Sequence, residues 1–373
     1  MSIRFLCIDD EADIVRQKTD DLSAIFPELE FEVRHPKPFD QEITAISAFK
    51  PSGLLLDLRL DKIPSEEGLR IKYRAISLAQ EMRTRMTENK LNSFPIVLWS
   101  VDAFFEQSYS RDKTSHDIFD MHFTKKFAPC QAEGIASKLI SLSKGYDKIV
   151  EIKGGSKKRN IFSKMIDLED EFDVLDSRIS SGLSSDRKFP VHVFAESILT
   201  GLILNQGPLI DESHLACRLG VDVQKSEDWN ALKNKLSKKL KYTGVFGDEW
   251  ERWWNFKLIR EWNKIHPNSP LQRTGANHRV DVLKKKYKLE NLVPIEAIES
   301  DYADDFWNIC AVTGKAVSIT DSVKLNVEHR DWLDATFASL SSVLERGHIA
   351  KGMKVHPYEI ARIKNLMEKK RDE

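Results

Sequence analysis

Five polar side chains in the first third of the chain each come directly after a short apolar run. They are an adjacent pair of acids, a third acid, a hydroxyl and an amine: Asp9, Asp10, Asp57, Ser100 and Lys125. Short apolar runs bounded by polar residues are typical of the buried strands of a parallel sheet. The carboxyl ends of such strands share one edge, where ligands bind. We therefore expect three carboxylates, a hydroxyl and an ammonium group to meet in one small site.

This set of groups suits a divalent cation together with a phosphoryl group. Mg²⁺ prefers oxygen ligands and is commonly held by one or two carboxylates with waters and phosphate oxygens, which fits Asp9 and Asp10. A carboxylate can attack a phosphoryl donor and form an acyl phosphate, so Asp57 is the candidate nucleophile. The metal and Lys125 would neutralise charge on the transferring group, and Ser100 would donate a hydrogen bond to it. The alternative is a solvated acidic cap on the helix that follows the acid pair.

The elements that must position these groups alternate between strand and helix over residues 1 to about 145. The expected strands are 3–8, 31–34, 53–57, 96–99 and 121–125, and the expected helices are 11–24, 40–49, 67–90, a less defined one within 103–119, and 131–142. Such alternation predicts right-handed βαβ units. The expected fold class is therefore an α/β domain with a doubly wound, five-stranded parallel sheet.

The order of these residues resembles the receiver domain of two-component response regulators. That family has an acid pair after strand one, a phospho-accepting Asp after strand three, a Ser or Thr after strand four and a Lys after strand five. The corresponding segments are Ile8-Asp9-Asp10-Glu11, Leu55-Leu56-Asp57-Leu58, Leu98-Trp99-Ser100 and Phe123-Thr124-Lys125. The resemblance covers about two-fifths of the chain and implies a flavodoxin-like receiver fold.

The resemblance also implies roles for individual residues and partners. Asp57 would accept phosphate from a histidine kinase or a phosphotransfer protein. Asp9, Asp10 and Asp57 would hold Mg²⁺ together with the backbone carbonyl of Arg59, while Ser100 and Lys125 would contact the phosphoryl group. A second copy of the chain is a further candidate partner.

Three features depart from the family pattern. Lys126 stands where the family usually has a proline, and His122 stands where an aromatic residue commonly rotates on activation. The segment between Asp57 and Pro95 is longer than in most receivers, so it is either a partner surface or a tolerated insertion in an exposed connection.

The remaining sequence is predicted to be a linker over 146–160 followed by a mostly helical output region over 161–373, with room for two subdomains. Seven of the eight tryptophans lie in this part. Expected helices include 162–179, 191–204, 248–265 and 302–309. The 248–265 stretch would place Trp250, Trp253 and Trp254 on one face.

Three output functions stay open. Residues 215–221 resemble the first helix and turn of a helix-turn-helix, although no second helix follows at once. An acidic cluster over 296–305 and the segment Cys310–Lys315, which resembles half of a zinc knuckle, are candidates for an enzymatic site. The Trp-rich helix favours a protein-interaction surface, and we take interaction as the first interpretation, with DNA binding or enzymatic activity as alternatives.

Bulk properties limit these interpretations. The formal net charge of -1 gives no global electrostatic case for nucleic-acid binding, although a local basic face stays open. The four cysteines, Cys7, Cys130, Cys217 and Cys310, form no CxxC pair and indicate neither a zinc ribbon nor a disulfide framework. No signal peptide or apolar span is recognisable, so a cytoplasmic protein without membrane contact is expected.

Overall fold

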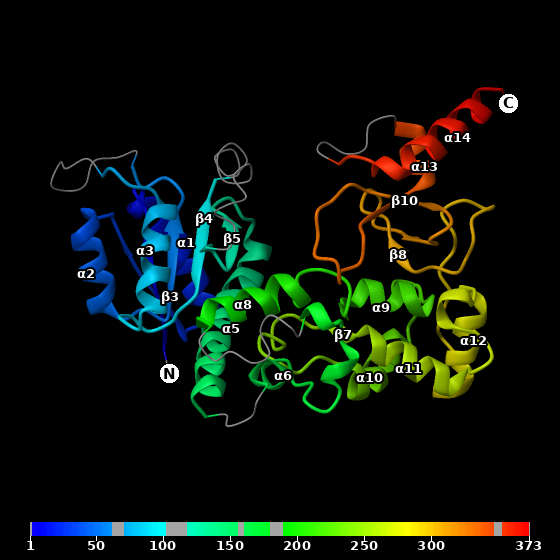
Figure 1. The fold of residues 1–373 in the computed structure, drawn as a ribbon, viewed down its shortest axis with the longest axis horizontal. Helices are drawn as coiled ribbons and strands as arrows, with labels where there is room; N and C mark the ends of the chain where they lie inside the picture. The colour runs from blue at the N-terminus through cyan, green and yellow to red at the C-terminus, as the bar shows by residue number, and fades with distance from the viewer. Residues whose placement is uncertain are drawn as a thin grey trace. The chain divides into compact units, whose positions relative to one another are not determined.

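The computed structural model describes residues 2–61, 71–101, 118–155, 160–179, 189–346 and 353–372. The chain divides into two compact units, Met1–Leu199 with Thr243–Trp250, and Thr200–Tyr242 with Glu251–Glu373. Among the helices described, none is both long and apolar enough to cross a membrane. Each unit is described by itself below (Figure 1).

The first unit contains a five-stranded parallel sheet with the order β2-β1-β3-β4-β5. Its strands are β1 (Ile3–Ile8), β2 (Leu29–Arg34), β3 (Gly53–Asp57), β4 (Ile96–Ser100) and β5 (Met121–Thr124). Every residue of β3 and β4 is buried, as expected for central strands covered on both faces. This strand order is that of the flavodoxin-like doubly wound fold, so the expected fold class of the N-terminal region is confirmed.

Helices cover both faces of this sheet (Figure 1). They are α1 (Ala12–Ile25), α2 (Phe39–Phe49), α3 (Ala75–Thr87) and α5 (Pro129–Gly155). One core packs alternate strand residues such as Leu54 and Leu56 against Ile46 of α2 and Leu78 of α3. Most of the helix expected within 103–119, and residues 62–70 of the long segment after Asp57, lie outside the described residues. The helix expected over 67–90 is shorter than predicted, because α3 covers only Ala75–Thr87 and residues 71–74 are not helical.

Helix α5 is much longer than the expected 131–142 and continues as far as Gly155. Most of the stretch expected to be a linker, 146–160, is therefore helical, and Tyr146, Ile149 and Ile152 on it are buried. Its packing partners within the first unit include α6 (Ile161–Met165) and α8 (Val191–Ile198). The apolar partners stabilise the extra turns, so the glycines there do not end the helix.

The second unit is built mainly from helices, which confirms a mostly helical C-terminal region, and its main apolar core lies among the first four of them. Its helices are α9 (Glu212–Leu219), α10 (Trp229–Leu240), α11 (Asn255–Ile265), α12 (Ala276–Tyr287), α13 (Leu340–Arg346) and α14 (Ile360–Asp372). Leu215, Leu232, Trp262 and Leu283, one from each of the first four helices, meet in that core.

Short antiparallel strand pairs complete the second unit. The pairs are β6 (Leu209–Ile210) with β7 (Trp253–Trp254), β8 (Asn308–Ile309) with β9 (Ala316–Val317), and β10 (Ser322–Lys324) with β11 (Phe337–Ser339). A separate small core gathers around Cys310, Val323 and Ala338 and includes Ile363 of α14.

Three of the helices expected after residue 160 also differ from the structure. The range 162–179 holds separate short pieces instead of one helix: α6, a 3₁₀ turn at Phe172–Val174, and helical residues at 177–179. The 302–309 stretch is not helical, since it ends in strand β8. Helix α11 begins at Asn255, because Trp253 and Trp254 pair with Ile210 and Leu209 as strand β7. Helical spacing alone could not anticipate this long-range pairing.

Candidate functional site

The strand register places the five predicted site residues at one edge of the sheet. Ile8 pairs with Leu56, so the next residues, Asp9 and Asp57, lie at the same level at the carboxyl ends of β1 and β3. Asp57 pairs with Trp99, and Ser100 is the next residue along β4. Ser100 in turn pairs with Thr124, which directly precedes Lys125. The shared carboxyl edge that the sequence predicted is therefore present.

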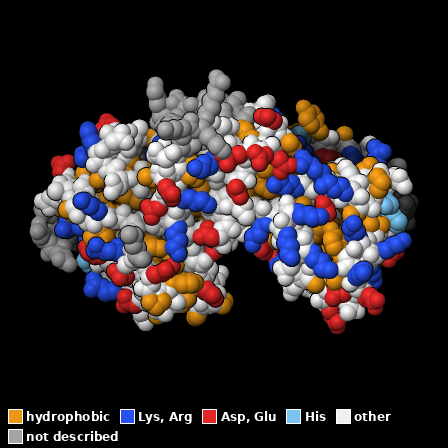
Figure 2. Space-filling view, turned by 90° about the horizontal axis from the view of Figure 1, so that it is seen from below, with side chains coloured by type: hydrophobic (Ala, Val, Ile, Leu, Met, Phe, Trp, Pro, Cys, Tyr) orange, Lys and Arg blue, Asp and Glu red, His pale blue; other side chains and the backbone are white. Residues whose placement is uncertain are grey.

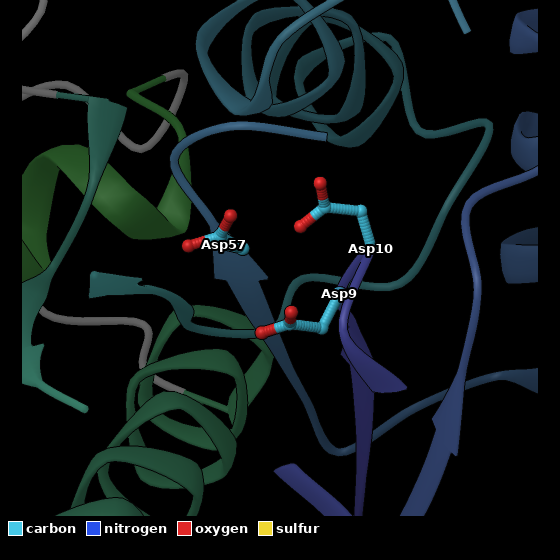
Figure 3. Close-up of side chains that lie close together, drawn as sticks. All are labelled: Asp9, Asp10 and Asp57. Carbon is cyan, nitrogen blue, oxygen red and sulfur yellow. The ribbon is translucent and has the colours of Figure 1, made fainter. Parts of the chain in front are cut away.

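The three carboxylates gather above the ends of β1 and β3 (Figure 3). One oxygen from each of Asp9, Asp10 and Asp57 lies within 4.8 Å of the others, and all three residues are buried. The Lys125 ammonium lies 2.8 Å from Asp57 Oδ1 and 2.7 Å from Asp9 Oδ2. A buried ammonium thus joins two of three buried carboxylates, which leaves the cluster with a net negative charge.

Burial and charge act in opposite directions on this cluster. Burial is the main reason why the pKa of Asp57 rises to about 6; Lys125 lowers it, while Asp9 and Asp10 raise it. Burial disfavours the ammonium of Lys125, but Asp9 and Asp57 together raise the pKa of Lys125 above its usual value. Asp57 is therefore mostly ionised at neutral pH, as a nucleophilic carboxylate must be.

The chemistry of the donor set fits Mg²⁺. The three carboxylates lie close together in a buried place, and like charges in such a place are costly unless a cation lies among them. The donors are oxygens, and their close spacing is what a small, hard cation requires. Asp9, Asp10 and Asp57 are therefore the residues that would hold the ion, and the backbone carbonyl of Arg59 stays a predicted ligand.

The remaining predicted residues take defined positions. The Ser100 hydroxyl is buried and donates to the carbonyl of Val101, 3.3 Å away. The backbone N–H of Arg59 donates to Asp57 Oδ2 at 3.1 Å, while the Arg59 guanidinium pairs with Asp61 at 2.8 Å. Arg59 therefore orients Asp57 through its backbone, and the contact of Ser100 with a phosphoryl group stays a prediction.

Two supporting contacts were not predicted from the sequence. Lys18 of α1 donates to the backbone carbonyl of Lys125 and so fixes the end of β5. The backbone N–H of Glu11 donates to Asp9 Oδ1 at 2.9 Å, which orients that carboxylate. The Glu11 contact is a local turn that an Asp two residues earlier favours. The Lys18 contact spans 107 residues of sequence and has no local signal.

In the part of the chain that the structure describes, the output features that the sequence predicted are not assembled into a site. Among described residues, the group of three close carboxylate, imidazole or thiol ligands is Asp9, Asp10 and Asp57, so the acidic stretch 296–305 brings no such group together. Trp253, Trp254 and Trp262 are fully buried and serve as core. Helix α9 ends at Leu219 and is capped by Gly220, with φ of 72°, and α10 begins only at Trp229. This spacing does not match the helix-turn-helix pattern.

The sheet order and the edge cluster confirm the expected receiver fold for the N-terminal region. No protein-family model matches the chain, and no curated protein matches it. Among solved structures it is similar to NtrX from Brucella abortus in complex with ADP, with 20% identity, 42% of this chain and 31% of that chain covered, and a TM-score of 0.30. This chain therefore spans less than a third of the length of NtrX.

Two isolated receiver structures are also similar. The signal receiver domain of the response regulator NarL from Mycobacterium tuberculosis shares 14% identity, covering 39% of this chain and 98% of that chain, with a TM-score of 0.25. The CheY-like receiver domain from Methylobacillus flagellatus shares 14% identity, covering 37% of this chain and 99% of that chain, with a TM-score of 0.27.

Proposed function

We propose that this protein is a response regulator that accepts a phosphoryl group on Asp57 and signals through its C-terminal region. The observation that carries the proposal is the buried Asp57 carboxylate, 2.8 Å from the Lys125 ammonium and within 4.8 Å of the Asp9 and Asp10 oxygens. A phosphoryl acceptor needs an ionised nucleophile with cations placed around the transferring group. Three buried carboxylates so close together repel one another and favour a bound cation.

In the proposed reaction, Asp57 attacks the phosphorus of a phosphohistidine on a histidine kinase or a phosphotransfer protein. A bond forms between a carboxylate oxygen and phosphorus, the bond from phosphorus to the imidazole nitrogen breaks, and the product is an acyl phosphate. Mg²⁺, when bound, neutralises charge on the phosphoryl oxygens. The Lys125 ammonium holds one of those oxygens, and Ser100 donates its hydroxyl to another.

A segment of the C-terminal sequence offers a route by which the site could act on the output. Residues 243–250 belong to the first unit, although they lie between α10 and β7 in the sequence. Ser141 of α5 donates to Asp248 at 2.7 Å, and Ser137 donates to Glu249. Phe246 packs over Gly145. We name residues 243–250 the α5-binding loop.

The α5-binding loop contacts one stripe of α5, because positions 137, 141 and 145 are four residues apart and share one helix face. Helix α5 begins four residues after Lys125. We propose that a phosphoryl group on Asp57, by drawing Lys125 toward it, shifts α5 and thereby the loop. The helical C-terminal region then presents a different surface to its partner.

Phosphorylation is tested with a small-molecule phosphodonor and Mg²⁺, followed by intact-mass measurement. Wild type should gain the mass of one phosphoryl group, and the gain should disappear in Asp57→Ala. An increment that persists in Asp57→Ala, or none in folded wild type with several donors, would contradict the assignment. A Ser137→Ala/Ser141→Ala variant tests the route: it should be phosphorylated normally but should show no phosphorylation-dependent change in the hydrogen exchange of residues 243–250.

A further inference from the structure

The three helices α10, α11 and α12 carry most of the positive charge around the second unit's main core. Together they contain eleven lysines and arginines and two acids, Glu261 and Asp281, which is a net charge of +9. The whole chain has a formal net charge of -1. The positive charge is therefore concentrated rather than spread, and a concentrated field attracts a polyanion at long range.

Contacts between these helices show that their charged ends lie next to one another. Lys235 of α10 donates to the backbone carbonyl of Tyr287 at the end of α12, at 2.8 Å. Lys239 of α10 and Lys264 of α11 both approach the carboxylate of Glu261, at 2.5 and 3.9 Å. One of the two acids is thus buried beneath lysines from two helices, and the end of the third helix is bound to the same face of α10.

Several lysines of these three helices are exposed around this junction. We define the basic helix face as Lys235, Lys238, Lys239, Lys264, Lys285 and Lys286, all of which are exposed. Figure 2 shows Lys and Arg side chains gathered over this part of the second unit, with few Asp or Glu side chains among them. Lysines on flexible stems bind phosphates as point charges and do not demand one fixed geometry.

The apolar residues of this region decide between kinds of partner. Among the described residues, no large hydrophobic side chain between Trp229 and Lys288 is exposed. A helix that binds in a membrane interface needs an exposed apolar face, and a protein hot spot needs exposed aromatic or aliphatic anchors. Sequence-independent binding of nucleic acid needs only cations that can reach the phosphate backbone.

We propose that the basic helix face binds the phosphate backbone of nucleic acid without strong sequence preference. The proposal stands apart from phosphorylation of Asp57, because it rests on residues of the second unit alone. The lysines replace condensed counterions on the phosphates, so binding weakens steeply as salt rises. Duplex DNA is the reference ligand, since its two strands give the highest phosphate density.

The test measures binding of the full chain to a fluorescent duplex of arbitrary sequence over a series of salt concentrations. The variant Lys238→Glu/Lys285→Glu/Lys286→Glu should bind at least ~10-fold more weakly. Its plot of log affinity against log salt should be shallower by about 0.9 for each phosphate that the variant no longer neutralises. The matched control is Lys72→Glu/Lys148→Glu/Lys164→Glu, which makes the same charge change at exposed lysines of the first unit.

The outcomes separate the possible ligands. Equally weakened binding in both triple variants would show a global charge effect and overturn the proposal, as would the absence of DNA and RNA binding at low salt. Vesicles with anionic lipid headgroups form a parallel arm, and binding to vesicles but not to nucleic acid would also overturn it. Asp57→Ala should bind DNA as unphosphorylated wild type does. The DNA-binding result can therefore be interpreted even if the phosphorylation test fails. Circular dichroism confirms that each variant is folded.

A second inference concerns four polar side chains in the small core near the C-terminus. Cys310 and Thr313 lie three residues apart in the turn between β8 and β9, and Ser339 and Ser342 lie three residues apart where β11 meets α13. The Cys310 sulfur is 3.6 Å from Ser339 Oγ and 3.9 Å from Ser342 Oγ. The two serine oxygens are 2.5 Å apart, and the Ser339 N–H donates to the sulfur at 3.1 Å.

The pairwise spacing in the sequence and the two distances from the Cys310 sulfur to the serine oxygens are similar to those of a four-ligand zinc site. Structural zinc is commonly held by two pairs of ligands, each pair a few residues apart in sequence, with zinc–sulfur bonds of about 2.3 Å, so the sulfurs of a tetrahedral site are about 3.8 Å apart. We infer that Cys310, Thr313, Ser339 and Ser342 form a hydrogen-bonded counterpart of such a site, in which hydroxyls replace three thiolates and join the two elements without an ion.

The inference is tested by introducing thiols at the three hydroxyl positions. Thr313→Cys/Ser339→Cys/Ser342→Cys should bind one zinc ion per chain, measured by metal analysis after dialysis, and its melting temperature should rise with zinc. Thr313→Cys alone, which has only two thiols, is the control and should retain none. Failure of the folded triple variant to bind zinc would overturn the inference. So would a fall in the wild-type melting temperature on chelation in zinc-free buffer, provided that added zinc restores it.

Discussion

The ring of Phe246 lies so close to Gly145 that a methyl group on Gly145 would overlap it. Helix α5 therefore needs a glycine here for a reason of packing rather than backbone conformation. The contact joins a helix of the sheet domain to a residue 101 positions later in the sequence, and hydrogen bonds from Ser137 and Ser141 to the same loop flank it.

Gly145→Ala should release the α5-binding loop. A methyl group that meets an aromatic ring in a packed place costs about 1–3 kcal/mol, which exceeds the ~1 kcal/mol that alanine gains over glycine within a helix. We expect a lower free energy of unfolding and faster hydrogen exchange in residues 243–250. Gly134→Ala on the same helix is the matched control, because nothing lies within 4 Å of the added methyl, and it should be neutral or stabilising. Similar behaviour of the two variants would argue against the contact.

Asp57→Asn should stabilise the metal-free protein at neutral pH. The pKa of Asp57 is raised to about 6, first by burial, so the folded protein binds this proton more tightly than the unfolded chain does. The ionised carboxylate therefore opposes folding above pH 6, and its cost falls as the pH drops from about 6 toward 4. With a chelator at about pH 7.5, we expect a gain of ~1–3 kcal/mol, reduced to about half at pH 5.

Denaturant titrations at the two pH values measure this gain. Added Mg²⁺ should stabilise wild type more than Asp57→Asn, since the variant lacks one of the three charges that favour the ion. If the variant were destabilised at neutral pH, or if the gain grew on acidification, the ionised Asp57 carboxylate would not be the group whose burial opposes folding.

Lys125→Gln should make the cluster more dependent on a cation. Removal of the ammonium leaves the carboxylates of Asp9 and Asp57 without the partner that now lies 2.7 and 2.8 Å away. Breaking a buried pair in this way costs about 3–5 kcal/mol, because uncompensated charge stays behind. We expect a lower melting temperature with chelator and a larger rise on addition of Mg²⁺ than in wild type. Lys126→Gln, at the exposed next residue, is the control and should change neither value.

Tyr146→Phe should weaken the attachment of the long helix to the sheet. The Tyr146 hydroxyl donates to Asp120 Oδ1 at 2.5 Å, and Arg83 pairs with Asp120 Oδ2 at 2.7 Å, with all three side chains buried. Loss of a buried hydrogen bond to a charged group costs ~1.5–3 kcal/mol. Chemical denaturation of wild type, Tyr146→Phe, Arg83→Met and the double variant gives a cycle. Strictly additive effects would mean that the three groups do not act as one network.

The sequence alone predicted the group of polar side chains at the sheet edge, and the reason is physical. Each of Asp9, Asp57, Ser100 and Lys125 follows a short apolar run, and a parallel sheet brings all strand ends of one polarity to one edge. Residue order and local pattern were therefore sufficient to predict both the sheet and the side chains above it. The helix boundaries were less certain, because packing partners far away in sequence set where α5 ends.

Tertiary structure alone decided how the rest of the chain is used. The tryptophans at 253 and 254 have helical spacing, but pairing with Leu209 and Ile210 makes them strand and core. Ser339 and Ser342 carry no signal on their own and matter only because the fold places them beside Cys310. Phe246 and Gly145 meet across 101 residues. Contacts of this range depend on how whole elements pack, so local propensity and residue spacing do not predict them.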